Sequence, residues 1–324
     1  MMIDESLGLH SYSSVTHNLA RATARVMSRS APTTAIPFAA ACLGIALFSA
    51  MDAAMKGLSI SMGAYNAMLW RVGIGVLVSV GPYMFRHGGW PSRSGLRVHL
   101  LRGGVSAIMA VSFFYGLARV PLAEGIALSF IAPLIALFLA VVMLGEKVGR
   151  HSMIASVLGI VGVGVLLAAR VGSSGERHLD GVAAILVSAL FYAWNIILMR
   201  QQALLASPTE VAFFQNLTCG GFLFLAAPFL AVVPDVRHVP MLVLSAVLAF
   251  CSLLLLSWAY ARAEAQVLVP VEYTAFIWAA IMGAIFYAEP VTGTTIIGAG
   301  FIVTGCIIAA RGGRPDISKL EAAV

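Results

Sequence analysis

Long apolar runs, separated by short polar segments, follow one another along nearly the whole chain. A helix needs roughly 20 apolar residues to cross the ~30 Å hydrocarbon core of a bilayer. Backbone polar groups must bond internally in lipid, so runs of this length predict membrane-spanning α-helices. Ten spans are predicted, at residues 36–56, 64–85, 99–118, 122–144, 151–169, 179–199, 209–233, 241–261, 266–288 and 291–310.

The two ends of the chain lie outside these runs. Residues 1–35 are polar, and the apolar run that follows is longer than the hydrophobic region of a typical signal peptide. We therefore expect a cytoplasmic tail here, and a second one at 312–324. The loops between the runs are too short to hold a soluble domain.

Composition supports the same interpretation. Hydrophobic residues make up 60% of the chain and charged residues 10%, whereas a soluble globular domain carries about a quarter charged residues. So few charges cannot cover a water-soluble protein of this size, which excludes that class. The net charge of +6 comes from basic residues in loops and tails, without a basic stripe or a nucleic-acid motif. We expect no nucleic-acid partner.

The basic residues also predict an orientation. With the amino terminus inside, fourteen of the 20 lysines and arginines fall in inner segments, five fall in outer segments, and Arg71 lies within a span. Cytoplasmic loops of membrane proteins carry an excess of these residues. This bias predicts a multi-pass membrane protein with both termini in the cytoplasm.

The chain also repeats itself. The segment ALFSAMD at 46–52 matches ALFYAWN at 189–195, and Phe130 matches Tyr273 at the same offset of 143 residues. The repeat divides the chain into halves at 36–170 and 179–311, each with five predicted spans. Because five is odd, the second half enters the membrane from the opposite face. Inverted repeats of this kind are common in secondary transporters, which bind substrate between the halves near the bilayer midplane.

These features, together with short motifs, resemble a known family. Leu144-Gly145-Glu146 closes the fourth predicted span, Ala288-Glu289 closes the ninth, and residues 270–278 read PVEYTAFIW. The chain resembles the EamA-domain transporters of the drug/metabolite transporter superfamily over residues 37–311. One departure is that the fourth span carries Pro133, whereas the proline of the ninth is Pro270.

The resemblance implies a secondary transporter that moves a small metabolite across the bacterial inner membrane by alternating access. The substrate that it implies is an amino acid, an amine or carboxylate metabolite, or a cofactor such as S-adenosylmethionine or riboflavin. It implies no cofactor that stays bound to the protein. The chain has no Walker loop, no metal-ligand cluster and no nucleophile elbow. A membrane scaffold or sensor is one alternative, although the short loops offer little docking surface. An intramembrane enzyme is another, although no set of catalytic residues converges.

Ionisable residues inside predicted spans are candidates for function, because burying them is costly. Asp52 and Arg71 lie at similar depths from the outer ends of the first two spans, so an ion pair between them is expected. It could form part of an outer gate, or it could be a fixed structural pair. At the inner side, Asn195 is the repeat partner of Asp52, and Gln215 and Asn216 are expected opposite it.

Glu272 is the strongest single candidate for the substrate site. It lies about a third of the way into the ninth span, two residues after Pro270, and its repeat partner is Ser129. The proline frees a backbone carbonyl, which suits a polar cavity wall. Glu272 could bind a cationic substrate group, could carry a coupling proton, or could pair with a neighbouring helix.

Aromatic and small residues complete the set of candidates. Tyr115, Tyr273 and Trp278 are placed as cavity residues that could stack on a flat or cationic substrate. Glycines in the fifth and tenth spans have the spacing for close helix packing, either within the chain or in a homodimer.

Overall fold

The computed structural model describes residues 35–86, 89–136, 150–171, 179–260, 262 and 271–312. Nearly all of both expected tails lies outside these residues. The regular structure in the described ranges is helical, without strands. The helices are α2 (Ala35–Met62), α3 (Ala64–Arg86), α4 (Arg93–Leu117), α5 (Leu122–Ser129), α7 (Arg150–Val171), α8 (Leu179–Leu205), α9 (Pro208–Leu225), α10 (Ala227–Leu230), the 3₁₀ turn η2 (Val236–His238), α11 (Val239–Tyr260), α13 (Ala275–Tyr287) and α14 (Gly293–Gly312).

Length and composition allow five of the described helices to cross a membrane. They are Ala35–Met62, Ala64–Phe85, Arg93–Leu117, Leu179–Met199 and Val236–Ala259. Shorter apolar helices occupy Leu122–Ala136, Val157–Leu166, Ala275–Tyr287 and Gly293–Gly305. The fold is therefore all-helical in its described part and rich in helices that suit a bilayer.

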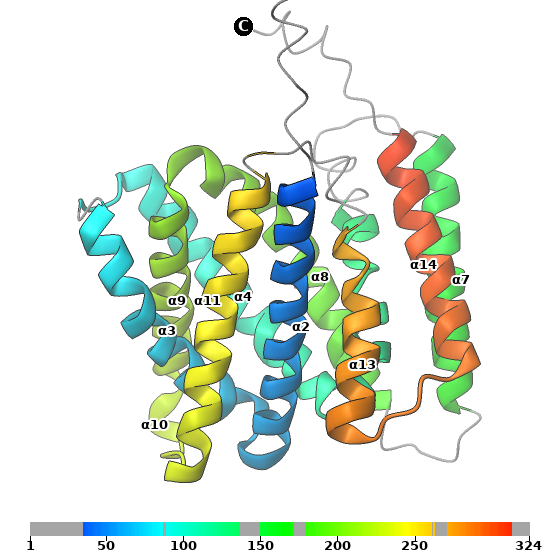
Figure 1. Ribbon diagram of the computed structural model, residues 1–324, viewed down its shortest axis with the longest axis horizontal. Helices are drawn as coiled ribbons and strands as arrows, with labels where there is room; N and C mark the ends of the chain where they lie inside the picture. The colour runs from blue at the N-terminus through cyan, green and yellow to red at the C-terminus, as the bar shows by residue number, and fades with distance from the viewer. Residues whose placement is uncertain are drawn as a thin grey trace, which may run out of the picture.

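The helices run up and down in one bundle (Figure 1). We call the end where α2 begins the upper face, and the end where α2 gives way to α3 the lower face. Gly63 makes that turn possible, because its φ of 82° is a left-handed conformation that glycine adopts without strain. Within the bundle, α2 packs against α11, α4 against α8, α3 against α9, and α7 against α14.

The predicted seventh span, at 209–233, is shorter as a continuous helix than its apolar run suggests. α9 ends at Leu225, the one-turn α10 follows, and the chain after it is not helical until η2. Pro228 lies in the first turn of α10. A proline cannot donate the backbone hydrogen bond that would continue α9, which explains the break.

The fourth and ninth predicted spans are interrupted at equivalent positions. Turns replace helix at Phe130 and Ile131 and again at Tyr273 and Thr274, which are separated by the repeat offset of 143 residues. In the first break, Pro133 lacks the N–H that would bond to the carbonyl four residues earlier.

In the second break, the hydroxyl of Thr274 donates to the carbonyl oxygen of Val271 at 2.6 Å, and such local bonds compete with a helix. The rings of Phe130 and Tyr273 meet edge to face, with centroids 5.4 Å apart. The two broken helices therefore touch at their breaks.

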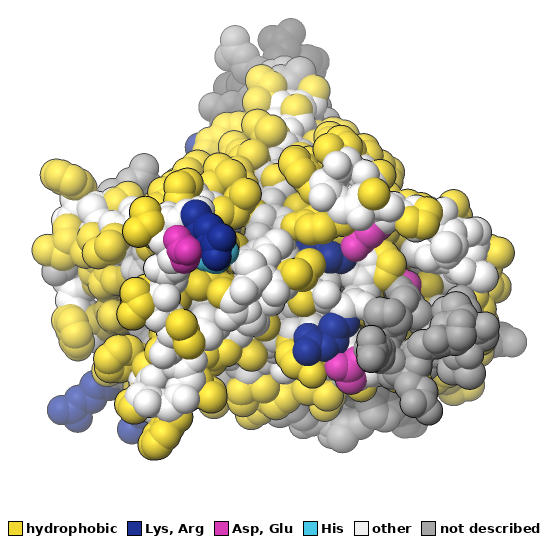
Figure 2. Space-filling model, turned by 90° about the horizontal axis from the view of Figure 1, so that it is seen from below, with side chains coloured by type: hydrophobic (Ala, Val, Ile, Leu, Met, Phe, Trp, Pro, Cys, Tyr) yellow, Lys and Arg dark blue, Asp and Glu magenta, His cyan; other side chains and the backbone are white. Residues whose placement is uncertain are grey.

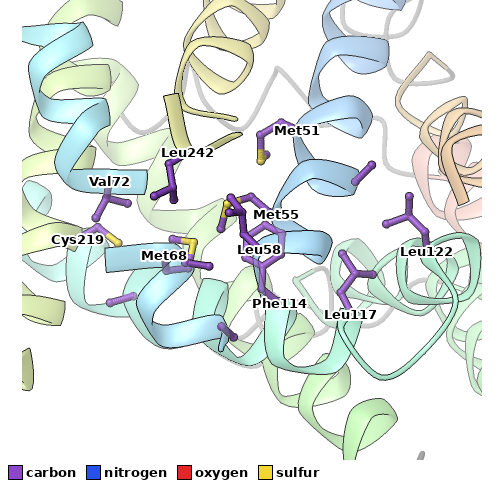
Figure 3. Packing of buried hydrophobic residues seen from close by; sticks show 14 of the residues in the cluster. Met51, Met55, Leu58, Met68, Val72, Phe114, Leu117, Leu122, Cys219 and Leu242 are labelled. Atoms are coloured by element: carbon purple, nitrogen blue, oxygen red, sulfur yellow. The ribbon is translucent and has the colours of Figure 1, made fainter. Parts of the chain in front are cut away.

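A buried apolar cluster joins the lower halves of several helices (Figure 3). Met55 from α2, Met68 from α3 and Leu117 from α4 are fully buried in it. Many large apolar side chains instead lie on the outside: Leu77 is 73% exposed, Phe85 94% and Phe229 87%. Such a surface would aggregate in water but matches the apolar interior of a bilayer.

Candidate functional site

Two opposite charges lie on neighbouring helices inside the bundle. Asp52 on α2 is 2% exposed, and it interacts electrostatically with Arg71 on α3. However, Oδ1 of Asp52 and Nε of Arg71 are both buried without a hydrogen-bond partner. These two atoms do not bond to each other, so each retains the capacity to bond a polar ligand group.

Tyr192 on α8 marks an opening inside the bundle. Leu190 and Trp194 are exposed on one side of α8, and at 100° per residue Tyr192 points about 200° away from both. It is nevertheless 38% exposed, so it faces an interior space rather than lipid. Its phenol interacts electrostatically with Glu272, Arg102 and Asp52. Charged groups from both halves of the chain therefore converge on this tyrosine.

Glu272 and Ser129 lie immediately before the two helix breaks. Glu272 is exposed although its neighbour Val271 is buried, which agrees with a position at the opening that Tyr192 faces. Ser129 is half-buried, and its hydroxyl donates to the carbonyl oxygen of Ile126 at 2.8 Å.

Toward the upper face, Arg102 on α4 is the centre of a buried polar network. Its Nε donates to Oδ1 of Asn195 at 3.1 Å, and its Nη1 donates to Oε1 of Gln202. Ser106 also donates to Oδ1 of Asn195, at 3.3 Å. Arg102 is 8% exposed and Gln202 1%. Asn195 is thus held by a guanidinium rather than by the amides that the sequence suggested.

The network continues to a histidine and a carboxylate. Nε2 of Gln202 lies 2.5 Å from Nδ1 of His99, and Nε2 of His99 lies 3.2 Å from Oε1 of Glu210. The imidazole is fully buried and stacks on Phe214, with ring centroids 4.8 Å apart. Glu210 is partly exposed in the first turn of α9, so the network reaches from the interior almost to solvent.

At the lower face, an ion pair connects α2 to the end of α13. Lys56 pairs with Oε1 of Glu289 and donates to the carbonyl oxygen of Val120 at 2.6 Å. Oε2 of Glu289 accepts from the backbone N–H of Leu122 at 2.7 Å, one of the amides at a helix start that lack an internal partner. We call Lys56, Glu289 and the backbone groups of Val120 and Leu122 the lower clasp.

The backbone beside the lower clasp is shaped to present Glu289. Ala288 ends α13 in the left-handed conformation, with φ 52°, and the hydroxyl of Tyr287 donates to the carbonyl oxygen of Ala53 at 2.5 Å. A pocket of about 410 Å³ opens beside the clasp and includes Arg119 in its wall. Figure 2 shows this face from below, with acidic and basic side chains meeting in a few places on a largely hydrophobic surface.

Three other predicted site residues lie in different surroundings. Tyr115 donates to Oδ2 of Asp180 at 3.2 Å, and the guanidinium of Arg119 lies 3.4 Å from its ring centroid. Trp278 packs beside a small apolar cluster. Oε1 of Gln215 is buried without a hydrogen-bond partner. The structure thus brings Asp52, Glu272 and the unpredicted Tyr192 together, and places Tyr115 with Arg119 and Asp180.

Sequence reasoning missed several polar residues of these networks. Lys56 and Arg102 were counted as loop residues, which is wrong, because the structure buries them in α2 and α4. The bias in basic residues keeps its direction without them. Both lie within the predicted spans, so a charge inside an apolar run was the available signal. His99 also lies within a predicted span, whereas Gln202 lies beyond the predicted end of its span at residue 199. Tyr192 could not be told from an interfacial tyrosine.

Comparisons with known proteins identify the family. The model of the EamA-like transporter family matches residues 35–168 and again 179–311. The pseudopaline exporter of Pseudomonas aeruginosa is 26% identical over 274 residues, which cover 82% of this chain and 92% of the exporter. The riboflavin transporter of Rhizobium johnstonii is 26% identical over 283 residues, covering 83% and 88%.

Two further comparisons extend the picture. The S-adenosylmethionine uptake transporter of Rickettsia felis is 22% identical over 278 residues, covering 86% of this chain and 93% of that protein. A solved crystal structure superposes with a TM-score of 0.58 at 18% identity, covering 85% of this chain and 96% of the other. At that identity the likeness shows the fold alone.

The family match spans most of the chain and occurs twice, and the named relatives are transporters of small molecules. With its membrane-length helices, the protein is a multi-pass membrane protein. The chain belongs to the EamA-like transporter family, within the drug/metabolite transporter superfamily.

Proposed function

We propose that this protein is a secondary transporter that carries a small charged metabolite across the membrane by alternating access. The observation that supports this most directly is the convergence of Asp52, Arg102 and Glu272 on the interior tyrosine Tyr192. Oδ1 of Asp52 and Nε of Arg71 are buried without a hydrogen-bond partner, which is costly unless a ligand or water satisfies them. A binding site between the halves gives these residues a reason to be there.

The proposed architecture is ten membrane helices in two inverted five-helix repeats. The packing of the helices supports it. The repeat makes α8 the partner of α2 and α11 the partner of α4. The contact of α2 with α11 therefore corresponds to the contact of α8 with α4, and both contacts occur. α3 packs on its own partner α9, and α7 on its own partner α14. The two helix breaks, with their touching rings, are equivalent under the same exchange.

Each face then has its own closure. The lower clasp holds the lower face through a charged pair, and the network of Arg102, Gln202 and His99 holds the upper face. We propose that the two open in turn. Following the bias in basic residues, the upper face is cytoplasmic, both termini lie inside, and the membrane is the bacterial inner membrane.

We propose a substrate that carries an amine, a carboxylate or both. Glu272 and Asp52 suit a cationic group, and Arg71 suits an anionic one. Relatives are named as transporters of pseudopaline, riboflavin and S-adenosylmethionine. These names agree with an amino acid, a related metabolite or a cofactor as the substrate. A homodimer remains an expectation. Gly164 and Gly300 have open space beside them within this chain, so a second copy of the chain has room to pack there.

A ligand screen tests this proposal. The purified protein is heated with amino acids, S-adenosylmethionine, riboflavin or polyamines, and the unfolding temperature is measured. A specific ligand stabilises the folded state by mass action, by about 2.7 kcal/mol at a hundredfold excess over its Kd. We expect one class to raise the unfolding temperature, and Glu272→Gln to abolish that rise.

Asp235→Asn is the matched control, because this carboxylate pairs with Arg237 on the exposed lower face. A rise that survives in Glu272→Gln and is equal in Asp235→Asn would remove Glu272 from the site. Uptake of the stabilising ligand into proteoliposomes that contain the protein is then measured. If no uptake occurs, a membrane sensor becomes the better explanation of the binding than a transporter.

A further inference from the structure

The hydrogen bonds of the upper network determine where the protons lie. The guanidinium of Arg102 can only donate hydrogen bonds, so the atom of Gln202 that faces it must be the carbonyl oxygen. The amide nitrogen of Gln202 therefore faces His99 and donates to Nδ1. It follows that Nδ1 carries a lone pair and that the proton of the neutral imidazole is on Nε2, directed at Glu210.

This arrangement has a second state. If Nδ1 of His99 takes up a proton, an N–H faces the amino group of Gln202, and two donors meet in a fully buried place. Rotation of the Gln202 amide by half a turn removes that conflict, but it then turns the amino group toward Arg102. The guanidinium loses an acceptor, and its hold on α8 is reduced to Asn195.

The groups around His99 favour a proton rather than another ligand. Glu210 on α9 accepts from Nε2 and would balance the charge of the imidazolium. Arg102, also on α4, carries the same charge as an imidazolium and is linked to His99 through Gln202 of α8. Tyr83 on α3 interacts with Glu210. Phe214 covers the ring. Histidine is the side chain whose ordinary titration lies nearest neutrality.

We propose that His99 is the proton-binding site that couples transport to the proton gradient. One proton from the aqueous phase at the lower face adds to Nδ1, reverses the Gln202 amide, leaves Arg102 held to α8 by Asn195 alone and favours opening of the upper face. Loss of that proton to the aqueous phase at the upper face restores the bond and closes that face, so one proton crosses from the lower to the upper side in each cycle. Glu272 is then left to the substrate. This inference rests on the proposed function, and it assigns the coupling ion and its residue.

Cysteine accessibility tests the coupling without a known substrate. The reporter is Tyr192→Cys in a chain whose four native cysteines are replaced by serine. A membrane-impermeant methanethiosulfonate is added to the upper face in vesicles of known orientation. The rate of modification of the reporter at each pH is divided by the rate measured for Ser94→Cys, an exposed position on the same face. This division removes the dependence of thiol reactivity on pH.

We expect the normalised rate to be about tenfold higher at about pH 6 than at about pH 8. His99→Gln should remove this pH dependence. Gln202→Glu should remove it as well, because two carboxylate oxygens accept from Arg102 and from a protonated His99 together. His238→Gln, a histidine near the lower face, should leave the pH dependence unchanged.

The outcomes separate the two proposals. A pH dependence that is equal in the parent and in both network variants overturns the role of His99. If the reporter still reacts from both faces in that case, alternating access stands. A reporter that reacts from only one face under all conditions, with or without a stabilising ligand from the screen, counts against the transporter itself.

Discussion

At the scale of single residues, the buried charges differ in how well they are satisfied. Lys56 and Glu289 bond to each other and to backbone groups, whereas Asp52 and Arg71 retain buried atoms without partners. A buried ion pair adds stability only when its remaining bonds are made. We therefore propose that the first pair closes the lower face and that the second binds a ligand.

The lower clasp should show strong coupling between its members. Lys56→Met leaves Glu289 without its cationic partner and should lower the free energy of unfolding by about 3 kcal/mol. In the double variant with Glu289→Gln, the loss should be smaller than the sum of the single losses by about 1 kcal/mol or more. Denaturant unfolding in detergent measures all three variants.

The exposed pair Arg237 and Asp235 provides a comparison on the same face. The losses in the free energy of unfolding of its two single variants should add up in the double variant to within about 0.5 kcal/mol, because solvent screens the attraction between the two charges. Additive losses at Lys56 and Glu289 would show that the clasp does not act as a unit.

At the scale of helices, close packing depends on where glycine lies. A Cβ on Gly162 of α7 would meet the carbonyl oxygen of Gly298 on α14 at 2.7 Å and Ile302 at 2.6 Å, whereas a Cβ on Gly164 would meet nothing within 4 Å. The sequence predicted close contacts for both glycines. Only the packed pair shows which face of α7 turns toward α14.

Two alanine substitutions on this one helix should have opposite effects. Gly162→Ala forces α7 and α14 apart and should destabilise the protein by about 1 to 3 kcal/mol. Gly164→Ala has room and should stabilise by up to about 1 kcal/mol, through the higher helix propensity of alanine. Thermal unfolding of both in one detergent measures the difference. Equal effects would contradict the packing of α7 on α14.

At the scale of the whole molecule, the two broken helices meet between the halves. Ser129 and Glu272 precede the breaks, and the rings of Phe130 and Tyr273 touch. Interrupted helices at equivalent positions of two repeats are a common site of substrate binding in secondary transporters. A movement of one half against the other would change access to both positions together.

Cysteines at these two positions should report that movement. Ser129→Cys and Glu272→Cys should react with an impermeant reagent from opposite faces. A stabilising ligand should change the rate at Ser129→Cys, whereas Glu272→Cys lacks the carboxylate proposed to bind the ligand and should not respond. Ile285→Cys, which is 68% exposed on the apolar surface of α13, should not respond to the ligand. Reaction of both cysteines from the same face under all conditions would contradict alternating access.

Much of this protein follows from local pattern alone. Runs of apolar residues predict helices because lipid leaves the backbone no other way to satisfy its polar groups. The repeat offset of 143 residues and the motif at Glu289 indicated the family, which the family match confirmed. Asp52 and Glu272 were candidates because charge is costly in a membrane.

The partners of these residues could not be found in the same way. Arg102 meets Asn195 93 residues away, and Lys56 meets Glu289 233 residues away, and no local pattern encodes such distances. The interior direction of Tyr192 also depends on which face of α8 the other helices leave open. Local sequence decides that a segment is a helix. The packing of the whole bundle decides which polar groups come together, because a buried charge bonds to the groups that the neighbouring helices present.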